Sequence, residues 1–156
     1  MLTVFCISHI AYLLRLQPLN PQAGSVGLVL FLLFTTQFND VCQYVWGKLL
    51  GRHKIVPKVS PNKTWEGFVG GVASAVLLGT LLWWATPFNP WQSALMSLAI
   101  TMMGFFGGLT MSAIKRDRGV KDYGTLIPGH GGMLDRIDSL CFAAPVFFHL
   151  TRYYFG

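Results

Sequence analysis

Five apolar runs, separated by shorter polar segments, dominate the pattern along this chain. They cover residues 2–16, 25–38, 68–85, 93–111 and 140–150. The strands of a membrane barrel would require apolar and polar residues to alternate. Within each of these runs, apolar residues follow one another without such alternation. Because backbone groups in lipid must be satisfied within the segment, we predict that the runs are helices. The second run is expected to continue through Asp40 to about Trp46, and the last to Tyr154.

Composition points to the same class of protein. The chain of 156 residues is 53% hydrophobic and only 12% charged, whereas a soluble domain carries about 25% charged residues. At roughly 20 residues for each spanning helix, five spans fit this length. The predicted fold is therefore an all-α integral membrane protein with about five transmembrane helices. We expect residues 1–156 to form a single membrane-embedded domain.

The positive charges are concentrated in two loops on either side of the third and fourth runs. Ten of the twelve Lys and Arg residues lie there: Lys48, Arg52, Lys54, Lys58 and Lys63 in the first loop, and Lys115, Arg116, Arg118, Lys121 and Arg136 in the second. The positive-inside rule places both loops in the cytoplasm, with the N-terminus inside and the C-terminus outside. Since this asymmetry accounts for the net charge of +6, nucleic acid is not an expected partner.

The six acidic residues are more informative than the basic ones. Asp40 lies near the end of an apolar run, where an ionisable side chain is costly and is a functional candidate. The alternative is an interfacial aspartate paired with Lys48 or another basic residue. Asp135 and Asp138 would share one face if their segment opens a helix. Two such carboxylates can hold a hard cation such as Mg²⁺, or they can simply cap the helix and fill its first turn.

Two further segments supply groups suited to phosphate. The sequence IPGHGG at 127–132 combines a turn with glycines that let backbone N–H groups approach an anion. In the first loop, SPNKTWEG at 60–67 offers hydroxyl, amide and ammonium donors. This segment also has the pattern of a helix start, with Thr64 before the helix and Glu66 in its first turn. Glu66 is a candidate to hold a metal or to orient Lys63.

Together, the two loops bring basic side chains, glycine turns and carboxylates to one membrane face. These are the groups used in metal-assisted phosphoryl or nucleotidyl transfer. The sequence contains no Walker P-loop, no HExxH pair and no serine hydrolase elbow.

The second loop resembles the signature of the phosphatidate cytidylyltransferase family, also called CDP-diglyceride synthases. The segment reads SAIKRDRGVKDYGTLIPGHGGMLDRID at 112–138. The matching residues are Ser112, Lys115, Arg116, Lys121, Asp122, Pro128, His130, Gly131, Gly132, Asp135, Arg136 and Asp138. The stretches NDVCQYVWGKLLG and SPNKTWEG look like the upstream segments of that family. Family members usually have several more helices before this region, so the chain is expected to correspond to their C-terminal catalytic part.

The resemblance implies transfer of CMP from CTP to phosphatidate, which gives CDP-diacylglycerol and pyrophosphate for phospholipid biosynthesis. It implies Mg²⁺ as cofactor, with a second metal ion left open. The metal ligands would be Asp135, Asp138, Asp122 and Asp40. The catalytic residues would be Asp122, Asp135, Asp138, Lys121 and Arg136. The residues that bind substrate would be Ser60, Asn62, Lys63, Thr64, Ser112, Lys115, Arg116, His130, Gly131 and Gly132.

The implied partners are CTP, phosphatidate and membrane lipids, and a homodimer is a further expectation from the family. The implied location is the inner cell membrane, with the site facing the cytoplasm. Three alternatives remain open from the sequence. The chain could be a non-catalytic fragment or partner subunit of a complete synthase, a CTP transferase for another lipid phosphate, or a small transporter.

Overall fold

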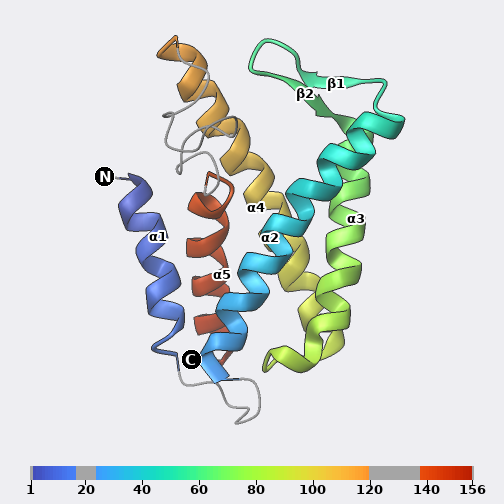
Figure 1. Cartoon of the computed structure of the whole chain (residues 1–156). Coiled ribbons are helices and arrows are strands. Elements are labelled where there is room, and N and C mark those ends of the chain that lie inside the picture. Colours follow the sequence, from blue (N-terminus) through green and yellow to red (C-terminus); the bar gives the residue numbers. More distant parts are fainter. Residues whose placement is uncertain (1, 17–23, 120–137, 156) are drawn as a thin grey trace, which may run out of the picture.

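The computed structural model describes residues 2–16, 24–119 and 138–155 (Figure 1). Within these ranges the chain forms five α-helices, one short 3-10 segment and one hairpin. Their bounds are α1 Leu2–Leu13, α2 Gly24–Leu50, β1 Lys54–Val56, β2 Ser60–Thr64, α3 Trp65–Leu81, η1 Leu82–Ala85, α4 Pro90–Asp117 and α5 Leu140–Phe155. The helices therefore fall on the five apolar runs, as predicted.

Three segments are long and apolar enough to cross a membrane, which confirms the predicted class of helical membrane protein. They are Val26–Leu50, Trp65–Ala85 and Pro90–Asp117. Of the other two helices, α1 has 12 residues and α5 has 16. They pack against each other beside the longer helices (Figure 1). The expectation of about five spans thus becomes three helices of spanning length and two shorter ones among the described residues.

Local signals explain where the long helices begin. The hydroxyl oxygen of Thr64 accepts a hydrogen bond from the backbone N–H of Gly67 at 3.1 Å, so Thr64 caps α3 as predicted. At the start of α4, Pro90 occupies the first turn, where its missing N–H costs nothing. The side chain of Gln92 accepts a hydrogen bond from the backbone N–H of Asn89 at 3.0 Å. These caps fix the points at which α3 and α4 leave the loops.

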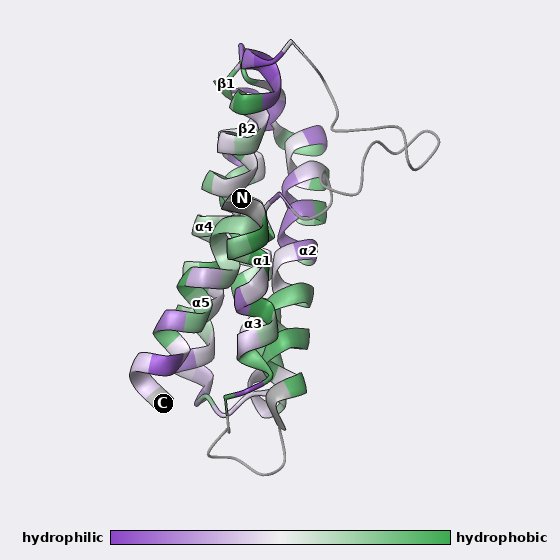
Figure 2. Cartoon of the chain, turned by 90° about the vertical axis from the view of Figure 1, so that its left-hand side faces the viewer, coloured by the Kyte–Doolittle hydropathy of each residue, from purple (hydrophilic) through white to green (hydrophobic). Residues whose placement is uncertain are grey.

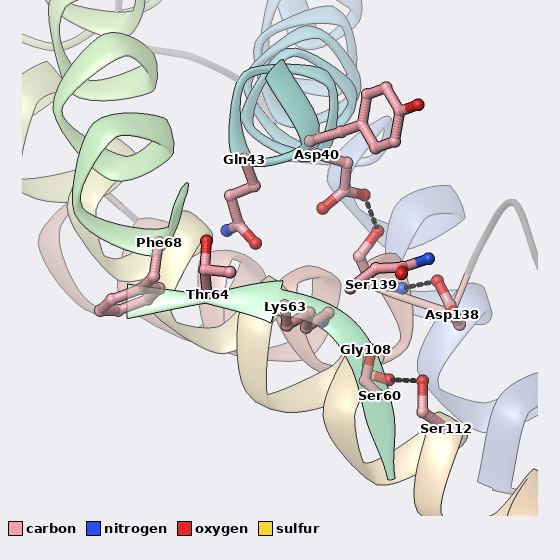
Figure 3. Close-up of a pocket in the computed structure, with 12 residues that line it drawn as sticks. Asp40, Gln43, Ser60, Lys63, Thr64, Phe68, Gly108, Ser112, Asp138 and Ser139 are labelled. Atoms are coloured by element: carbon pink, nitrogen blue, oxygen red, sulfur yellow. Dashed lines mark hydrogen bonds between the residues drawn. The ribbon is translucent and has the colours of Figure 1, made fainter. Parts of the chain in front are cut away.

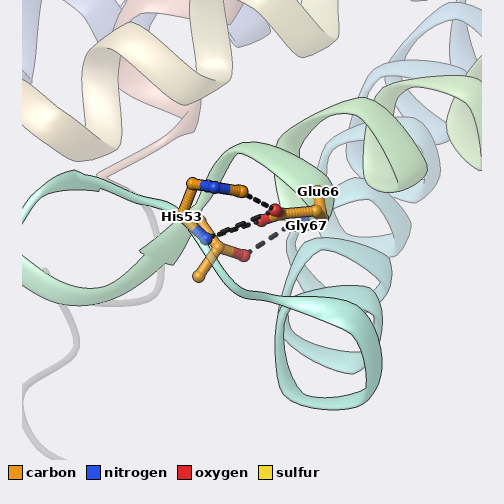
Figure 4. A network of polar contacts seen from close by, with 4 residues as sticks. His53, Glu66 and Gly67 are labelled. Atoms are coloured by element: carbon orange, nitrogen blue, oxygen red, sulfur yellow. Dashed lines mark hydrogen bonds and ion pairs between the residues drawn. The ribbon is translucent and has the colours of Figure 1, made fainter.

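The hairpin between α2 and α3 was not expected from the sequence. Strands β1 and β2 pair antiparallel, with Lys54 opposite Thr64 and Val56 opposite Ser60, and the register shifts between these pairs. Glu66 holds the hairpin to α3, because its carboxylate contacts the Nδ1 atom of His53 at 2.7 Å and accepts from the His53 backbone N–H (Figure 4). Glu66 therefore contacts His53 and not Lys63, contrary to the orienting role considered for it.

Small residues allow α2 and α3 to lie close together. The buried face of α3 carries Gly67, Gly71, Ala75 and Gly79, one residue per turn. A β-carbon added at Gly67 would lie 2.6 Å from the backbone oxygen of Gln43 on α2. This distance is shorter than van der Waals contact, so α2 could not pack as closely against a larger residue.

The two ends of the bundle differ in character. We call the end that holds the hairpin, the end of α4 and the start of α5 the hairpin end; hydrophilic residues gather around its hairpin (Figure 2). A cluster of buried apolar side chains packs α2, α4 and α5 together with Leu13 and Phe88. Its buried members are Leu13, Leu28, Phe31, Leu32, Phe88, Met96, Ile100, Leu140, Ala143, Ala144, Phe147 and Phe148. This cluster is the hydrophobic core of the described residues.

Candidate functional site

A cavity of about 230 Å³ opens at the hairpin end, where α2, β2, α3, α4 and the start of α5 meet (Figure 3). Twelve residues line it: Asp40, Gln43, Tyr44, Ser60, Asn62, Lys63, Thr64, Phe68, Gly108, Ser112, Asp138 and Ser139. Seven of them are candidates from the sequence: Asp40, Ser60, Asn62, Lys63, Thr64, Ser112 and Asp138. The fold therefore brings together residues from four separate parts of the chain: α2, β2, α4 and the residue pair before α5.

Lys63 lies in the interior of this arrangement. A β-carbon at Gly108 of α4 would be 2.9 Å from the Lys63 ammonium. The lack of a side chain at Gly108 therefore leaves room for this ammonium to lie against α4. The ammonium also lies 4.8 Å from the centre of the Phe105 ring, within the range of a cation–π contact. Burial lowers the pKa of Lys63, and the nearby carboxylates of Asp40 and Asp138 act in the opposite direction. The site thus places a partly desolvated cation among acids.

The two acids are linked through one serine. The hydroxyl of Ser139 donates a hydrogen bond to Oδ2 of Asp40 at 2.8 Å, and its backbone N–H donates to Oδ1 of Asp138 at 2.8 Å (Figure 3). Among the described residues, Asp40 makes this contact and no ion pair with Lys48 or another basic side chain, which was the alternative explanation of its position. Carboxylate oxygens facing one cavity are the donors that a hard divalent cation prefers.

A second cleft of about 380 Å³ lies against the first and shares three of its residues, Ser60, Asn62 and Ser112. It adds Lys115 and Arg116 from the last turn of α4. The Nζ atom of Lys115 lies 3.8 Å from Oδ2 of Asp138. Arg116 Nε donates to the carbonyl of Val59 at 3.4 Å, which ties the end of α4 to the hairpin. Cations and hydroxyl or amide groups at this spacing suit an extended, multiply charged anion.

The remaining candidates lie outside the described residues. They are Lys121, Asp122, Pro128, His130, Gly131, Gly132, Asp135 and Arg136. One prediction about this region is wrong: α5 begins at Leu140, so Asp138 precedes the helix and does not lie on its face. The described ranges contain no group of three or more His, Cys, Asp or Glu side chains that could hold a metal. Their contribution to the predicted metal set is Asp40 and Asp138.

Five of the residues that line the cavity were missed by the sequence reasoning: Gln43, Tyr44, Phe68, Gly108 and Ser139. For two of them a signal was available. Gln43 follows Asp40 by three residues, which puts both on one face of a helix. Ser139 directly follows Asp138. Gly108 belongs to the site because the Lys63 ammonium lies against it. Spacing along the chain does not predict this long-range contact.

Comparison with known proteins assigns a family to this arrangement. The model of the cytidylyltransferase family matches residues 1–154. A phosphatidate cytidylyltransferase of Staphylococcus saprophyticus is 38% identical over 146 residues, which cover 91% of this chain and 56% of that protein. The phosphatidate cytidylyltransferase of Mycobacterium leprae is 42% identical over 130 residues, which cover 81% of this chain and 40% of that protein.

A further relative carries no activity in its name. The uncharacterized protein YnbB of Escherichia coli K12 is 56% identical over 156 residues, which cover 97% of this chain and 51% of that protein. The chain thus spans about half the length of the curated relatives it matches.

Proposed function

This chain belongs to the cytidylyltransferase family, and from that premise we propose that it transfers CMP from CTP to phosphatidate at the membrane surface. The products are CDP-diacylglycerol and pyrophosphate. The observation that carries the proposal is the cavity in which Asp40, Lys63 and Asp138 face one another at the hairpin end. A site at the end of a bundle of apolar helices is accessible to a soluble nucleotide and to a lipid headgroup.

The reaction joins two anions, and the residues of the site fit that task. An oxygen of the phosphatidate phosphate attacks the α-phosphorus of CTP, and the bond from that phosphorus to the leaving pyrophosphate breaks. The nucleophile is already ionised, so no strong general base is required. The main barrier is repulsion between negative groups, which fixed positive charges offset. We assign Lys63, Lys115 and Arg116 to this role.

Asp40 and Asp138 would hold a divalent metal ion, for which Mg²⁺ is the proposed identity. Their oxygens suit a hard cation, and both line the same cavity. Bound there, the ion would neutralise charge on the phosphates. Asp122 and Asp135 stay in the proposal as further ligands on the strength of the motif, and a second ion is left open. Lys121 and Arg136 are proposed to bind the phosphates on the same basis.

The remaining assignments concern binding. We propose that the hydroxyl and amide groups along the hairpin and α4 contact CTP or the lipid headgroup: Ser60, Asn62, Thr64 and Ser112. His130, Gly131 and Gly132 are assigned to the same function from the motif. The two clefts share Ser60, Asn62 and Ser112, which supports a continuous binding surface that could hold both substrates.

The proposed orientation follows from the positive-inside rule. The described basic residues of both loops lie at or beside the hairpin and the end of α4, so the hairpin end is assigned to the cytoplasmic side of the inner membrane. The predicted homodimer and the assignment of residues 1–156 as one domain stay predictions.

The direct test is CMP transfer from labelled CTP to phosphatidate by the purified chain in detergent. We expect product with Mg²⁺, no product after EDTA treatment, and recovery when Mg²⁺ is restored. A panel with phosphatidate, an ether-linked lipid phosphate and a water-soluble phosphomonoester identifies the acceptor. Product formation that persists in EDTA would contradict the metal assignment. A folded chain that binds CTP but forms no product with any acceptor would contradict the proposed activity.

A further inference from the structure

Ser139 directly precedes α5, but its side chain does not cap that helix in the usual way. Its carbonyl accepts from the backbone N–H of Ala143 at 3.4 Å, which places Ser139 at the N-cap of α5. A serine there normally turns its hydroxyl back to accept from the first turn. Here the hydroxyl donates across the bundle to Asp40 on α2, 99 residues away in the sequence. The hydroxyl of Ser139 therefore makes a long-range hydrogen bond and does not cap α5.

The same residue also fixes the second carboxylate. Its backbone N–H donates to Oδ1 of Asp138 at 2.8 Å. Two donors of one residue thus hold Asp40 on α2 and Asp138, the residue before Ser139. Ser139 is only 2% exposed, so water has little access to compete for either bond. Each bond accordingly constrains the direction in which its carboxylate points.

The packing around Ser139 keeps this arrangement in place. A β-carbon at Gly104 of α4 would lie 3.7 Å from the Ser139 Cβ atom and 3.7 Å from Thr36 Cγ2 on α2. Residues of three helices thus meet at this point. The bond to Ser139 uses Oδ2 of Asp40, and the second oxygen is directed away from Ser139 towards the side of Gln43 (Figure 3). Asp40 and Gln43 both line the cavity.

Two carboxylates that face one cavity repel each other, and hydrogen-bond donors or cations offset this repulsion. Asp40 and Asp138 both act on Lys63. Lys115 contacts the Oδ2 atom of Asp138, whereas the hydrogen-bond donor to Asp40 in the described part of the chain is Ser139.

We propose that Ser139 is a positioning residue that sets the distance and orientation of Asp40 and Asp138 as oxygen donors for a divalent cation. The inference rests on the proposed function, because it assumes that these two acids take part in metal binding. Ser139 itself touches neither the metal nor the substrates in this proposal. It acts through the two carboxylates.

The test is direct metal binding, measured with Mn²⁺ as a paramagnetic substitute for Mg²⁺ by electron paramagnetic resonance in detergent. We expect Ser139→Ala to weaken Mn²⁺ binding by about tenfold or more, the usual effect of losing a residue that orients a ligand. Ser139→Thr retains the hydroxyl and should restore most of the affinity. Ser97→Ala is the matched control, since Ser97 is an equally buried serine on α4 and does not line the cavity.

A double mutant separates positioning from a general loss of structure. If Ser139 acts through Asp40, the double variant Asp40→Asn with Ser139→Ala should bind Mn²⁺ no worse than Asp40→Asn alone. Additive losses would indicate a separate structural role and overturn the inference. Wild-type affinity in Ser139→Ala would overturn it as well, and so would the absence of Mn²⁺ binding by the wild-type chain. Normal Mn²⁺ binding by a chain that forms no CDP-diacylglycerol would reject the proposed activity alone.

Discussion

Helix α2 divides after Phe34 into two stretches of unequal length, called here its first or apolar half (residues 24–34) and its second or polar half (residues 35–50). Their difference shows what distinguishes the site from the rest of the bundle. In the first half, Leu28, Phe31 and Leu32 are buried in the apolar cluster with residues such as Phe147. In the second half the fully buried positions are polar, namely Thr35, Thr36 and Asn39. One continuous helix thus contributes an apolar core at one end and a polar interior at the other.

The difference shows that the two halves are built under different requirements. Apolar side chains in the first half need only complementary shape, which dense packing supplies. In the second half, the hydroxyl of Thr35 and both polar atoms of Asn39 are buried without a hydrogen-bond partner in the described part of the chain. An unpaired buried polar group costs about 1–3 kcal/mol. We infer that these groups lower the stability of the protein and provide a polar environment next to Asp40 on the same helix.

The largest effect on activity is expected at Lys63 on β2, which lines the same cavity as Asp40 in the polar half of α2. Replacing Lys63 with Ala removes the cation that lies between Gly108 and the Phe105 ring. Loss of one group that stabilises charge in a transition state typically costs about 100-fold or more in rate. We expect this loss in CMP transfer under saturating Mg²⁺.

Lys58→Ala is the matched control for Lys63, because Lys58 belongs to the same basic loop and is exposed. Its activity should stay within about twofold of wild type, as for most surface substitutions. Equal losses in the two variants would mean that the general positive charge of the loop matters and that the position of Lys63 does not.

The largest effect on stability is expected in the apolar cluster, where α5 packs against the apolar half of α2. Phe147 is 1% exposed and stacks on Phe31, with ring centroids 5.9 Å apart. Phe147→Ala leaves a cavity and should lower the free energy of unfolding by about 3–5 kcal/mol. SDS titration of the chain in mild detergent micelles measures this change. Phe34→Ala is the control, since Phe34 on the same helix α2 is exposed and its loss leaves no internal cavity.

This variant also tests whether the two halves are independent. Activity per folded molecule in Phe147→Ala should stay close to that of wild type at low temperature, because the substitution lies outside the residues that line the cavity. A loss of activity as large as that in Lys63→Ala would show that the apolar half controls the geometry of the site.

The sequence predicted the helices well because each helix corresponds to one apolar run. It also predicted the helix start at Thr64 and the meeting of Asp40, Lys63 and Asp138 at one end. The hairpin was missed because its strands are three and five residues long and carry no alternating pattern.

The contacts that organise the site were harder to predict. The hydroxyl of Ser139 reaches Asp40 across 99 residues, and the Lys63 ammonium reaches Gly108 through the packing of β2 against α4. Such contacts depend on how helices and strands pack in space, and the spacing of residues along the chain does not predict them. The pairing of Glu66 with His53 was missed for the same reason, since it requires the hairpin to fold back on α3.

The smallest predicted effect compares two neighbouring threonines on α2 that are both fully buried. The hydroxyl of Thr36 donates to the carbonyl of Leu32 at 2.6 Å, whereas the hydroxyl of Thr35 has no partner in the described ranges. Valine has the same shape as threonine but no hydroxyl. Thr36→Val should therefore lower the free energy of unfolding by about 1 kcal/mol, the net value of one hydrogen bond.

Thr35→Val should change stability in the opposite direction. It removes an unpaired buried hydroxyl, so the free energy of unfolding should rise by about 1 kcal/mol. The same SDS titration resolves the two variants by the sign of the shift. If Thr35→Val destabilises the chain as much as Thr36→Val does, its hydroxyl has a partner in the working protein, and the polar half of α2 is not a site of sacrificed stability. If it stabilises the chain and also lowers CMP transfer, stability and activity are opposed at this position, as the comparison of the two halves requires.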